Sequence, residues 1–222
     1  MNPIDHSRLH AARMRNDETK YRMDDMRPRF DRYRDRHTNG SAPRSYSAFQ
    51  LFQTPEALAA RMVEIANIGP DSHVLEPSAG LGRLLRPILA RNPASVTACE
   101  IDAELSGELF REFPTVQLLQ RDFLEVPPAR EGNAGTIVKQ TPRPFYTHVV
   151  MNPPFHMRAD IRHTLHALQF LHTGGTIVGL CMDTRHRAES LKPLSDHWEE
   201  IPAGTFSESG TGVACILFRI RP

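Results

Sequence analysis

Between residues 55 and 220, short apolar runs alternate with amphipathic segments, and this alternation constrains the fold more than any other feature. The apolar runs, which predict strands buried on both faces, lie at residues 73–77, 95–100, 116–120, 147–151 and 176–182. The segments with apolar residues three or four positions apart, which predict helices, lie at residues 55–67, 82–90, 103–112 and 160–172. Thr54 is the expected N-cap of the first of them. Such strands joined by helices form a parallel sheet covered on both faces. Runs at 198–202 and 213–220 predict a final antiparallel pair, so the expected fold is α/β with a seven-stranded, mostly parallel sheet.

The chain has 222 residues, enough for one α/β domain with a full core and an additional arm. No apolar run reaches the roughly 18 residues of a membrane helix, and the N-terminus lacks the apolar core of a signal peptide. All three cysteines, Cys99, Cys181 and Cys215, lie in apolar, strand-like runs. We therefore expect buried free thiols, a cytoplasmic location and no membrane partner.

The charge is divided unevenly along the chain. Residues 1–45 carry eleven Arg and Lys side chains against seven acidic ones, whereas the remainder is slightly acidic. We interpret 1–45 as an Arg-rich arm and linker, and 46–222 as the main domain with an irregular, proline-rich insertion at 125–146. The arm has two open interpretations. It is either a charged helix that is packed on the domain or half disordered, or a nucleic-acid contact element.

Polar residues and glycines follow the first three predicted strands. Glu76 begins the loop Glu-Pro-Ser-Ala-Gly-Leu-Gly that ends at Gly82, where glycines allow a ligand to approach the backbone closely. Glu100 ends the second strand, at the place where an acid binds ribose hydroxyls, and Asp122 with Phe123 follows the third, where they suit an adenine ring. A nicotinamide dinucleotide would require a third glycine for its pyrophosphate, and leucines occupy that place. The pattern favours a nucleoside cofactor without a diphosphate.

The tetrapeptide Asn152-Pro153-Pro154-Phe155 directly follows the fourth predicted strand. An exocyclic amine on a base is a poor nucleophile because its lone pair is delocalised into the ring. The Asn152 side chain and the Pro153 carbonyl can accept the two amine protons, while the prolines stiffen the loop and Phe155 offers a face for stacking. The expected reaction is a displacement that depends on positioning and electrostatic fit, without a metal or a covalent intermediate.

These motifs together resemble those of class I S-adenosylmethionine-dependent amino-methyltransferases with a Rossmann-like fold, and most of all DNA N6-adenine methyltransferases, including phage and prophage versions. The upstream Phe52-Gln53-Thr54-Pro55 and the later Asp160-Ile161-Arg162-His163 contribute to the resemblance. It implies S-adenosylmethionine as cofactor, DNA as partner, and catalysis by Asn152 to Phe155. The cofactor contacts that it implies are Thr54, Pro55, Glu76, Pro77, Ser78, Ala79, Gly80, Gly82, Glu100, Ile101, Asp122, Phe123 and Asn152. The substrate contacts that it implies are Phe155, His156 and Phe206.

The sequence leaves the substrate and the function open to other interpretations. The string that ends in His156 also resembles rRNA guanine-N2 methyltransferases, so adenine or guanine in RNA, or a glutamine amide in protein, is the second hypothesis. A non-catalytic nucleic-acid-binding descendant is the third. Asp160, His163 and His166 share a helix face. Two roles stay open for them, bracing of the tetrapeptide or a plain place on the helix surface, and no metal is expected. The oligomeric state is left undetermined.

Overall fold

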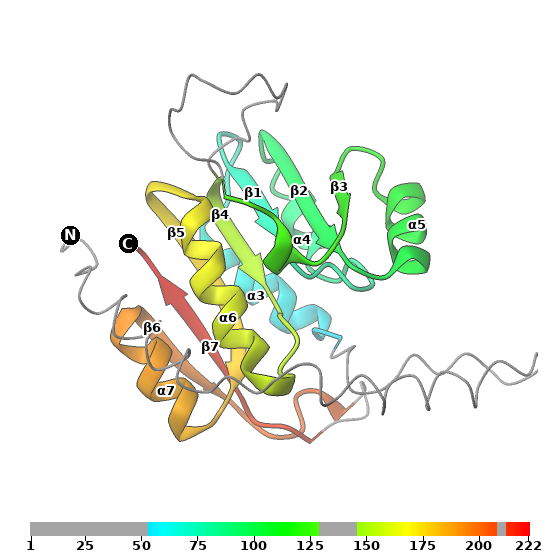
Figure 1. Cartoon of the computed structure of the whole chain (residues 1–222). Coiled ribbons are helices and arrows are strands. Elements are labelled where there is room, and N and C mark those ends of the chain that lie inside the picture. Colours follow the sequence, from blue (N-terminus) through cyan, green and yellow to red (C-terminus); the bar gives the residue numbers. More distant parts are fainter. Residues whose placement is uncertain (1–52, 129–145, 208–211) are drawn as a thin grey trace, which may run out of the picture.

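The computed structural model describes residues 53–128, 146–207 and 212–222 (Figure 1). The arm at residues 1–45, the segment 46–52 and most of the predicted insertion lie outside the described residues, so the predictions about them stay predictions.

The core of the fold is one seven-stranded sheet in the order β3-β2-β1-β4-β5-β7-β6. Its strands are β1 (His73–Glu76), β2 (Ser95–Glu100), β3 (Gln117–Gln120), β4 (Tyr146–Met151), β5 (Leu171–Met182), β6 (Ser195–Ile201) and β7 (Cys215–Ile220). The first five strands run parallel, and β7 pairs antiparallel with both β5 and β6. The predicted mostly parallel sheet with a closing antiparallel pair is therefore confirmed.

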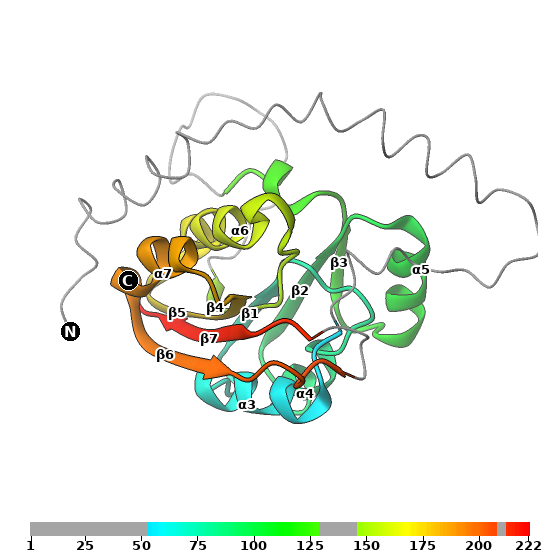
Figure 2. The ribbon, with the colours of Figure 1, turned by 90° about the horizontal axis from the view of Figure 1, so that it is seen from below.

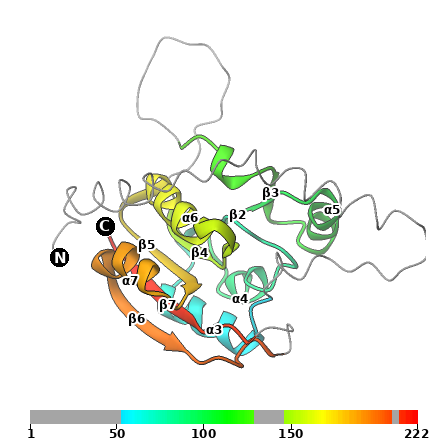
Figure 3. The same ribbon diagram turned by 60° about the horizontal axis from the view of Figure 1, so that its bottom comes forward.

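Side chains of each strand divide between two apolar layers. Val74 and Val150 belong to the cluster under α3 (Glu56–Ala66), α4 (Leu85–Leu89) and α5 (Ala103–Glu112), whereas their neighbours Leu75 and Val149 belong to the cluster under α6 (Ala159–Ala167) and α7 (Arg185–Leu191). Figure 2 shows α6 and α7 on one side of the sheet and α3 and α4 on the other, and Figure 3 shows α5 beside β3. Burial on both faces explains why the strands are continuously apolar in the sequence.

Three helices have other bounds than predicted, and a fourth helix was not predicted. The helix α3 begins at Glu56 with Pro55, and not Thr54, in the N-cap position. The helix α4 starts later than predicted because Gly82 has a φ of 71°, which a right-handed helix excludes. The helix α6 ends at Ala167, because Leu171 already pairs with Tyr146 in the sheet. The seven-residue helix α7 was not predicted, since only two of its residues are buried and its apolar pattern is weak.

The three cysteines are buried and free, as the sequence predicts. In the part of the chain that the structure describes, no helix is long and apolar enough to cross a membrane.

Candidate active site

A pocket of about 660 Å³ lies where the carboxyl ends of β1, β2, β3 and β4 meet. This edge is the usual ligand position in an open parallel sheet, because the chain leaves β1 and β4 in opposite directions there. The residues that line the pocket are Gln53, Thr54, Glu76, Pro77, Ser78, Ala79, Gly80, Leu81, Arg83, Leu84, Cys99, Glu100, Ile101, Asp102, Leu105, Arg121, Asp122, Phe123, Leu124, Asn152, Pro153, Pro154, His156, Ala159, Arg162 and His163. The fold thus brings together most of the predicted site residues.

The glycine loop after β1 is held against the end of β2 by backbone contacts. The Ala79 N–H donates to the Cys99 carbonyl at 2.9 Å, and the Gly80 N–H donates to Glu100 Oε2 at 2.7 Å. The other carboxylate oxygen, Glu100 Oε1, accepts from the Asp102 N–H at 2.9 Å. The Glu100 carboxylate therefore fixes the loop as well as facing the pocket, a role that the sequence did not indicate.

Gly82 does not line the pocket, although it was predicted to contact the cofactor. Its φ is 71°, and a Cβ built there would lie 2.4 Å from Phe113 Cε2. The glycine is thus required for close packing of the loop against Phe113, which follows α5. It acts on the pocket indirectly, by fixing the position of the loop.

Glu76 is the most unusual titratable group in the pocket. Its side chain is 1 % exposed, and within the described part of the chain its Oε2 atom has no hydrogen-bond partner. Burial raises the pKa of Glu76 well above its usual range, and the nearby Glu100 raises it further. A buried acceptor of this kind needs a donor or a cation to offset its desolvation, so the position fits a positively charged ligand group.

The end of β3 contributes Asp122 and Phe123. The Asp122 carboxylate accepts from the Leu124 N–H at 2.9 Å and caps the short 3-10 helix Phe123–Glu125. The Phe123 ring is 2 % exposed and packs edge-on against His166, with the ring centroids 4.8 Å apart. Phe123 therefore forms the floor of this part of the pocket. Ile101, which is 67 % exposed, lines the pocket from the end of β2.

Asn152 is held in place by a residue 98 positions earlier in the chain. Its Nδ2 donates to Thr54 Oγ1 at 2.9 Å, and Thr54 is buried. The sequence predicted that Thr54 caps α3, but the hydroxyl is used by Asn152 and the helix has no side-chain cap. Because the amide nitrogen points to Thr54, the amide oxygen lies on the other branch of the side chain.

Phe155 and Phe206 lie elsewhere than predicted. Their side chains are 3 % and 1 % exposed, belong to the core cluster under α3, and do not line the pocket. The expected stacking face of Phe155 is thus absent from the pocket wall, because the ring completes the core next to β4. Its neighbour His156 is exposed and lines the pocket.

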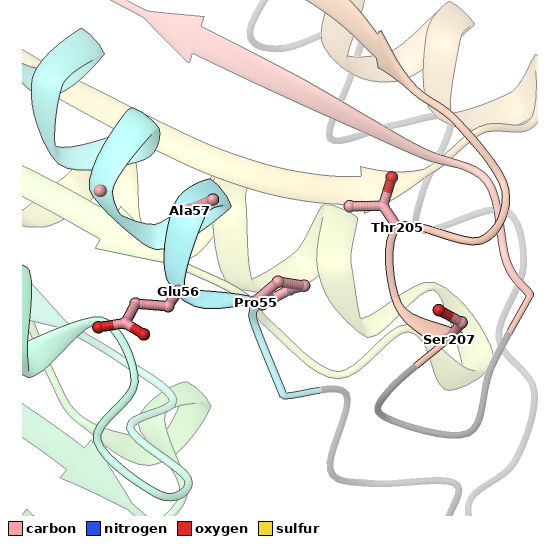
Figure 4. A pocket seen from close by; sticks show the side chains of 6 residues that line it. Pro55, Glu56, Ala57, Thr205 and Ser207 are labelled. Carbon is pink, nitrogen blue, oxygen red and sulfur yellow. The ribbon is translucent and has the colours of Figure 1, made fainter.

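Pro55 also lies outside the main pocket. It lines a second, shallower depression together with Glu56, Ala57, Ala60, Thr205 and Ser207, between the start of α3 and the loop after β6 (Figure 4). The two chain neighbours of Phe206 thus face this depression, while its own ring is buried.

Three arginines are among the residues that line the main pocket, beside its four carboxylates. Arg83, Arg121 and Arg162 line it, and Arg83 donates to Gln53 Oε1 at 3.2 Å. Among the described residues, neither Arg121 nor Arg162 has a carboxylate oxygen within 4.0 Å. The three arginines, none of which was predicted as a site residue, leave positive charge available to a polyanionic ligand.

His163 is the buried histidine of this pocket. It is 7 % exposed, and its Nδ1 shares a 3.3 Å hydrogen bond with Ser78 Oγ on the glycine loop. Burial lowers the pKa of His163 to about 4 against the opposing effect of Asp122, so the ring is neutral near pH 7. No group of three or more potential metal ligands occurs among residues 53–128, 146–207 and 212–222.

No family model matches the sequence. Among curated proteins, the ribosomal RNA small subunit methyltransferase A of Synechococcus sp. is 34% identical over 113 residues, which are 50% of this chain and 38% of that protein. The protein of the same name from Prosthecochloris aestuarii is 36% identical over 88 residues, 40% of this chain and 33% of that protein. The chain therefore matches between about a third and two fifths of the length of these relatives.

Solved structures match more of the chain at lower identity. The 23S rRNA methyltransferase ErmE has a TM-score of 0.54 and 22% identity, over 78% of this chain and 70% of that one. A type I restriction-modification methyltransferase subunit from Streptococcus thermophilus has a TM-score of 0.58 and 16% identity, over 76% and 44%. An RNA methyltransferase from Salinibacter ruber in complex with S-adenosyl-L-homocysteine has a TM-score of 0.51 and 17% identity, over 76% and 92%. The chain has the Rossmann-like fold of class I methyltransferases, as the sequence predicts.

Proposed function

We propose that this chain is an S-adenosylmethionine-dependent N-methyltransferase that methylates the N6 amino group of adenine in RNA. The observation that carries the proposal is that one pocket holds the buried Glu76, the glycine loop and the anchored segment from Asn152 to Pro154. These are the parts that bind a nucleoside with a cationic tail and place an amine beside it. The fold and the bound ligand of the Salinibacter ruber structure support the same cofactor.

The residues of the pocket fit S-adenosylmethionine. The unpaired oxygen of Glu76 faces a position for the cofactor's ammonium or sulfonium group, while Glu100 and Asp122 lie at the strand ends that suit its ribose and adenine. Ile101 and Phe123 add apolar walls. When bound, S-adenosylmethionine supplies an electrophilic methyl group.

The tetrapeptide activates the amine. The Asn152 amide is oriented by the hydrogen bond from its nitrogen to Thr54 Oγ1. In this proposal the amide oxygen accepts one amine hydrogen and the Pro153 carbonyl accepts the other. These two hydrogen bonds pull the amine hydrogens out of the plane of the base. The nitrogen lone pair is then no longer delocalised into the ring and can attack. Two rigid prolines keep these acceptors in a fixed position during the reaction. Polar groups that need not reorganise stabilise the transition state most effectively, and this lowers the barrier to methyl transfer.

RNA is preferred over the DNA substrate expected from the sequence because the aligned curated relatives are ribosomal RNA methyltransferases. The arginines that line the pocket support a polyanionic substrate of either kind. DNA adenine is the second candidate, and it rests on the segment before α3 that resembles DNA N6-adenine methyltransferases. Thr54 belongs to that segment, and its hydroxyl accepts a hydrogen bond from Asn152 of the tetrapeptide. The segment is therefore connected to the proposed site of the reaction.

The test is transfer of tritiated methyl groups from S-adenosylmethionine to small-subunit rRNA, large-subunit rRNA, single- and double-stranded DNA, and protein, followed by nucleoside chromatography. Label in N6-methyladenosine supports the proposal, and label only in N6-methyldeoxyadenosine supports the second candidate. Label only in guanine or protein, or no transfer at all, overturns it. Asn152→Ala is the inactive control, and full activity of this variant would contradict the mechanism.

The arm at residues 1–45 is proposed as an additional phosphate contact because of its basic charge. Deleting it is expected to weaken RNA binding and to flatten its salt dependence. Unchanged affinity and salt dependence would assign phosphate binding to the domain alone.

A further inference from the structure

A buried ion pair outside the pocket holds the loop that carries the proposed active site. The Arg187 Nε atom donates to Asp160 Oδ2 at 3.0 Å, and the side chains of the two residues are 12 % and 0 % exposed. Arg187 belongs to α7 and Asp160 to the first turn of α6, so the pair joins two helices on the same face of the sheet. Removing two charges from water is unfavourable, which makes such a pair a poor device for stability alone.

The same guanidinium reaches the tetrapeptide. Its Nη2 atom donates to the Phe155 carbonyl at 2.9 Å, and its Nη1 atom donates to Thr184 Oγ1 at 3.4 Å. Asp160 in turn accepts from the Met182 N–H at the end of β5, at 3.3 Å. The last residue of the tetrapeptide is therefore connected to the end of β5 through the Arg187 guanidinium and the Asp160 carboxylate.

The segment between the two contacts of Arg187 is strained. Met157 and Arg158 have φ values of 48° and 58°, in the left-handed region that residues with a Cβ disfavour. Such a turn persists only where its surroundings hold it. Arg187 contacts Phe155 just before this turn and Asp160 just after it, so a single side chain closes the turn.

We propose that Arg187 is a positioning residue for methyl transfer, because it fixes the end of the tetrapeptide by joining the Phe155 carbonyl to Asp160. Thr54 holds the first residue of the tetrapeptide and Arg187 holds the last, so the acceptors on Asn152 and Pro153 keep a constant position relative to the cofactor site. This inference rests on the proposed function. Only an arginine has the planar fork that donates to a carboxylate and a carbonyl at once, so a lysine retains the charge but not both contacts.

The test compares Arg187→Lys, Arg187→Met, the double variant Asp160→Asn with Arg187→Met, and Arg185→Gln. Arg185 lies on the same helix, but it is 93 % exposed and pairs with Glu189, so it is the matched control. The single Met variant leaves a buried carboxylate unpaired and is expected to lower Tm, whereas the double variant removes both charges and regains Tm. The expected kcat loss is about 10²-fold in the double variant and about tenfold in the Lys variant, with an unchanged Kd for S-adenosylhomocysteine.

Recovery of kcat together with Tm in the double variant would show that Arg187 is only structural and would overturn the inference. A fall in S-adenosylhomocysteine affinity in parallel with kcat would do the same. Hydrogen–deuterium exchange of peptides covering residues 152–160 gives a readout that needs no substrate. Faster exchange there in Arg187→Lys, but not in Arg185→Gln, supports the fixing of the tetrapeptide by Arg187. A wild-type protein that shows this exchange pattern but methylates nothing overturns the proposed function and not the contact. Unchanged exchange overturns the inference.

Discussion

Replacing Glu76 with glutamine is expected to stabilise the ligand-free protein and to weaken cofactor binding. Glu76 is 1 % exposed, and in the described part of the chain its Oε2 atom has no hydrogen-bond partner. A buried polar group without a partner costs about 1–3 kcal/mol, and more when it is charged. A glutamine side chain has the same shape and is still polar, but it carries no charge. Only the additional cost of ionisation is removed, and the free energy of unfolding rises by about 1–3 kcal/mol at neutral pH. For a domain of this size that corresponds to a Tm increase of about 2–12 °C.

The stabilisation depends on pH in a defined direction. The pKa of Glu76 in the folded protein is raised by burial above its ordinary value of 4.5. A raised folded pKa gives a contribution to stability that is complete below the unfolded pKa and is lost as the pH rises through the folded pKa. The Tm difference between Glu76→Gln and wild type is therefore small near pH 4 and grows as the pH rises. Differential scanning calorimetry at several pH values measures it.

Cofactor binding changes in the opposite direction. Losing one partner of a buried charge pair costs about 2–5 kcal/mol, so the Kd for S-adenosylmethionine rises at least about 30-fold. An equal loss for S-adenosylhomocysteine assigns the contact to the ammonium group, and a loss confined to S-adenosylmethionine assigns it to the sulfonium. Wild-type binding should also release a proton, seen as a dependence of calorimetric heat on the buffer.

The matched control is Glu108→Gln, an exposed carboxylate on α5 that should change neither quantity. A Glu76→Gln protein that melts below wild type at neutral pH, or that binds both ligands with wild-type affinity, would refute the reasoning.

Three further predictions follow from single contacts. Thr54→Val removes the acceptor that orients the asparagine amide and is expected to lower kcat about 10- to 100-fold with an unchanged Tm, whereas Thr54→Ser retains activity. Gly82→Ala places a methyl group 2.4 Å from Phe113 at a φ of 71° and should lower the free energy of unfolding, measured in urea, by at least about 2 kcal/mol. The control is Gly107→Ala, which has open space on a helix and should raise the free energy of unfolding by about 0.5–1 kcal/mol. The pKa of His163 is lowered to about 4, so its contribution to stability is present above pH 6.5 and is lost as the pH falls to 4. The loss amounts to about 3 kcal/mol. His163→Gln should remove this acid dependence of the free energy of unfolding. Equal kcat for the Val and Ser variants, an unchanged urea midpoint for Gly82→Ala, or an unchanged acid dependence would each contradict the corresponding contact.

Much of the pocket follows from the sequence, because its parts are local motifs placed at strand ends. Glu76 ends β1, Glu100 ends β2, and Asn152 follows β4 directly. The carboxyl ends of parallel strands lie at one edge of a sheet, so residues far apart in sequence meet there without any further instruction. Continuous apolar strands determine the parallel sheet in the same way, since each face must be covered by helices.

Contacts between distant side chains were decided only by the tertiary structure. Phe155 and Phe206 look like stacking residues in the sequence, yet both complete the core. Thr54 looks like a helix cap, yet its hydroxyl binds Asn152, 98 residues away.

The sequence by itself thus determined the sheet, its two helical layers and the strand-end motifs, because these depend on periodicity and on local order along the chain. Tertiary structure decided which aromatic rings fill the core, and it placed Arg187 of the unpredicted helix α7 against the Phe155 carbonyl. The physical reason is that packing and buried hydrogen bonds depend on which surfaces meet when the layers close over the sheet. No local sequence pattern around Arg187 or Phe155 predicts their contact.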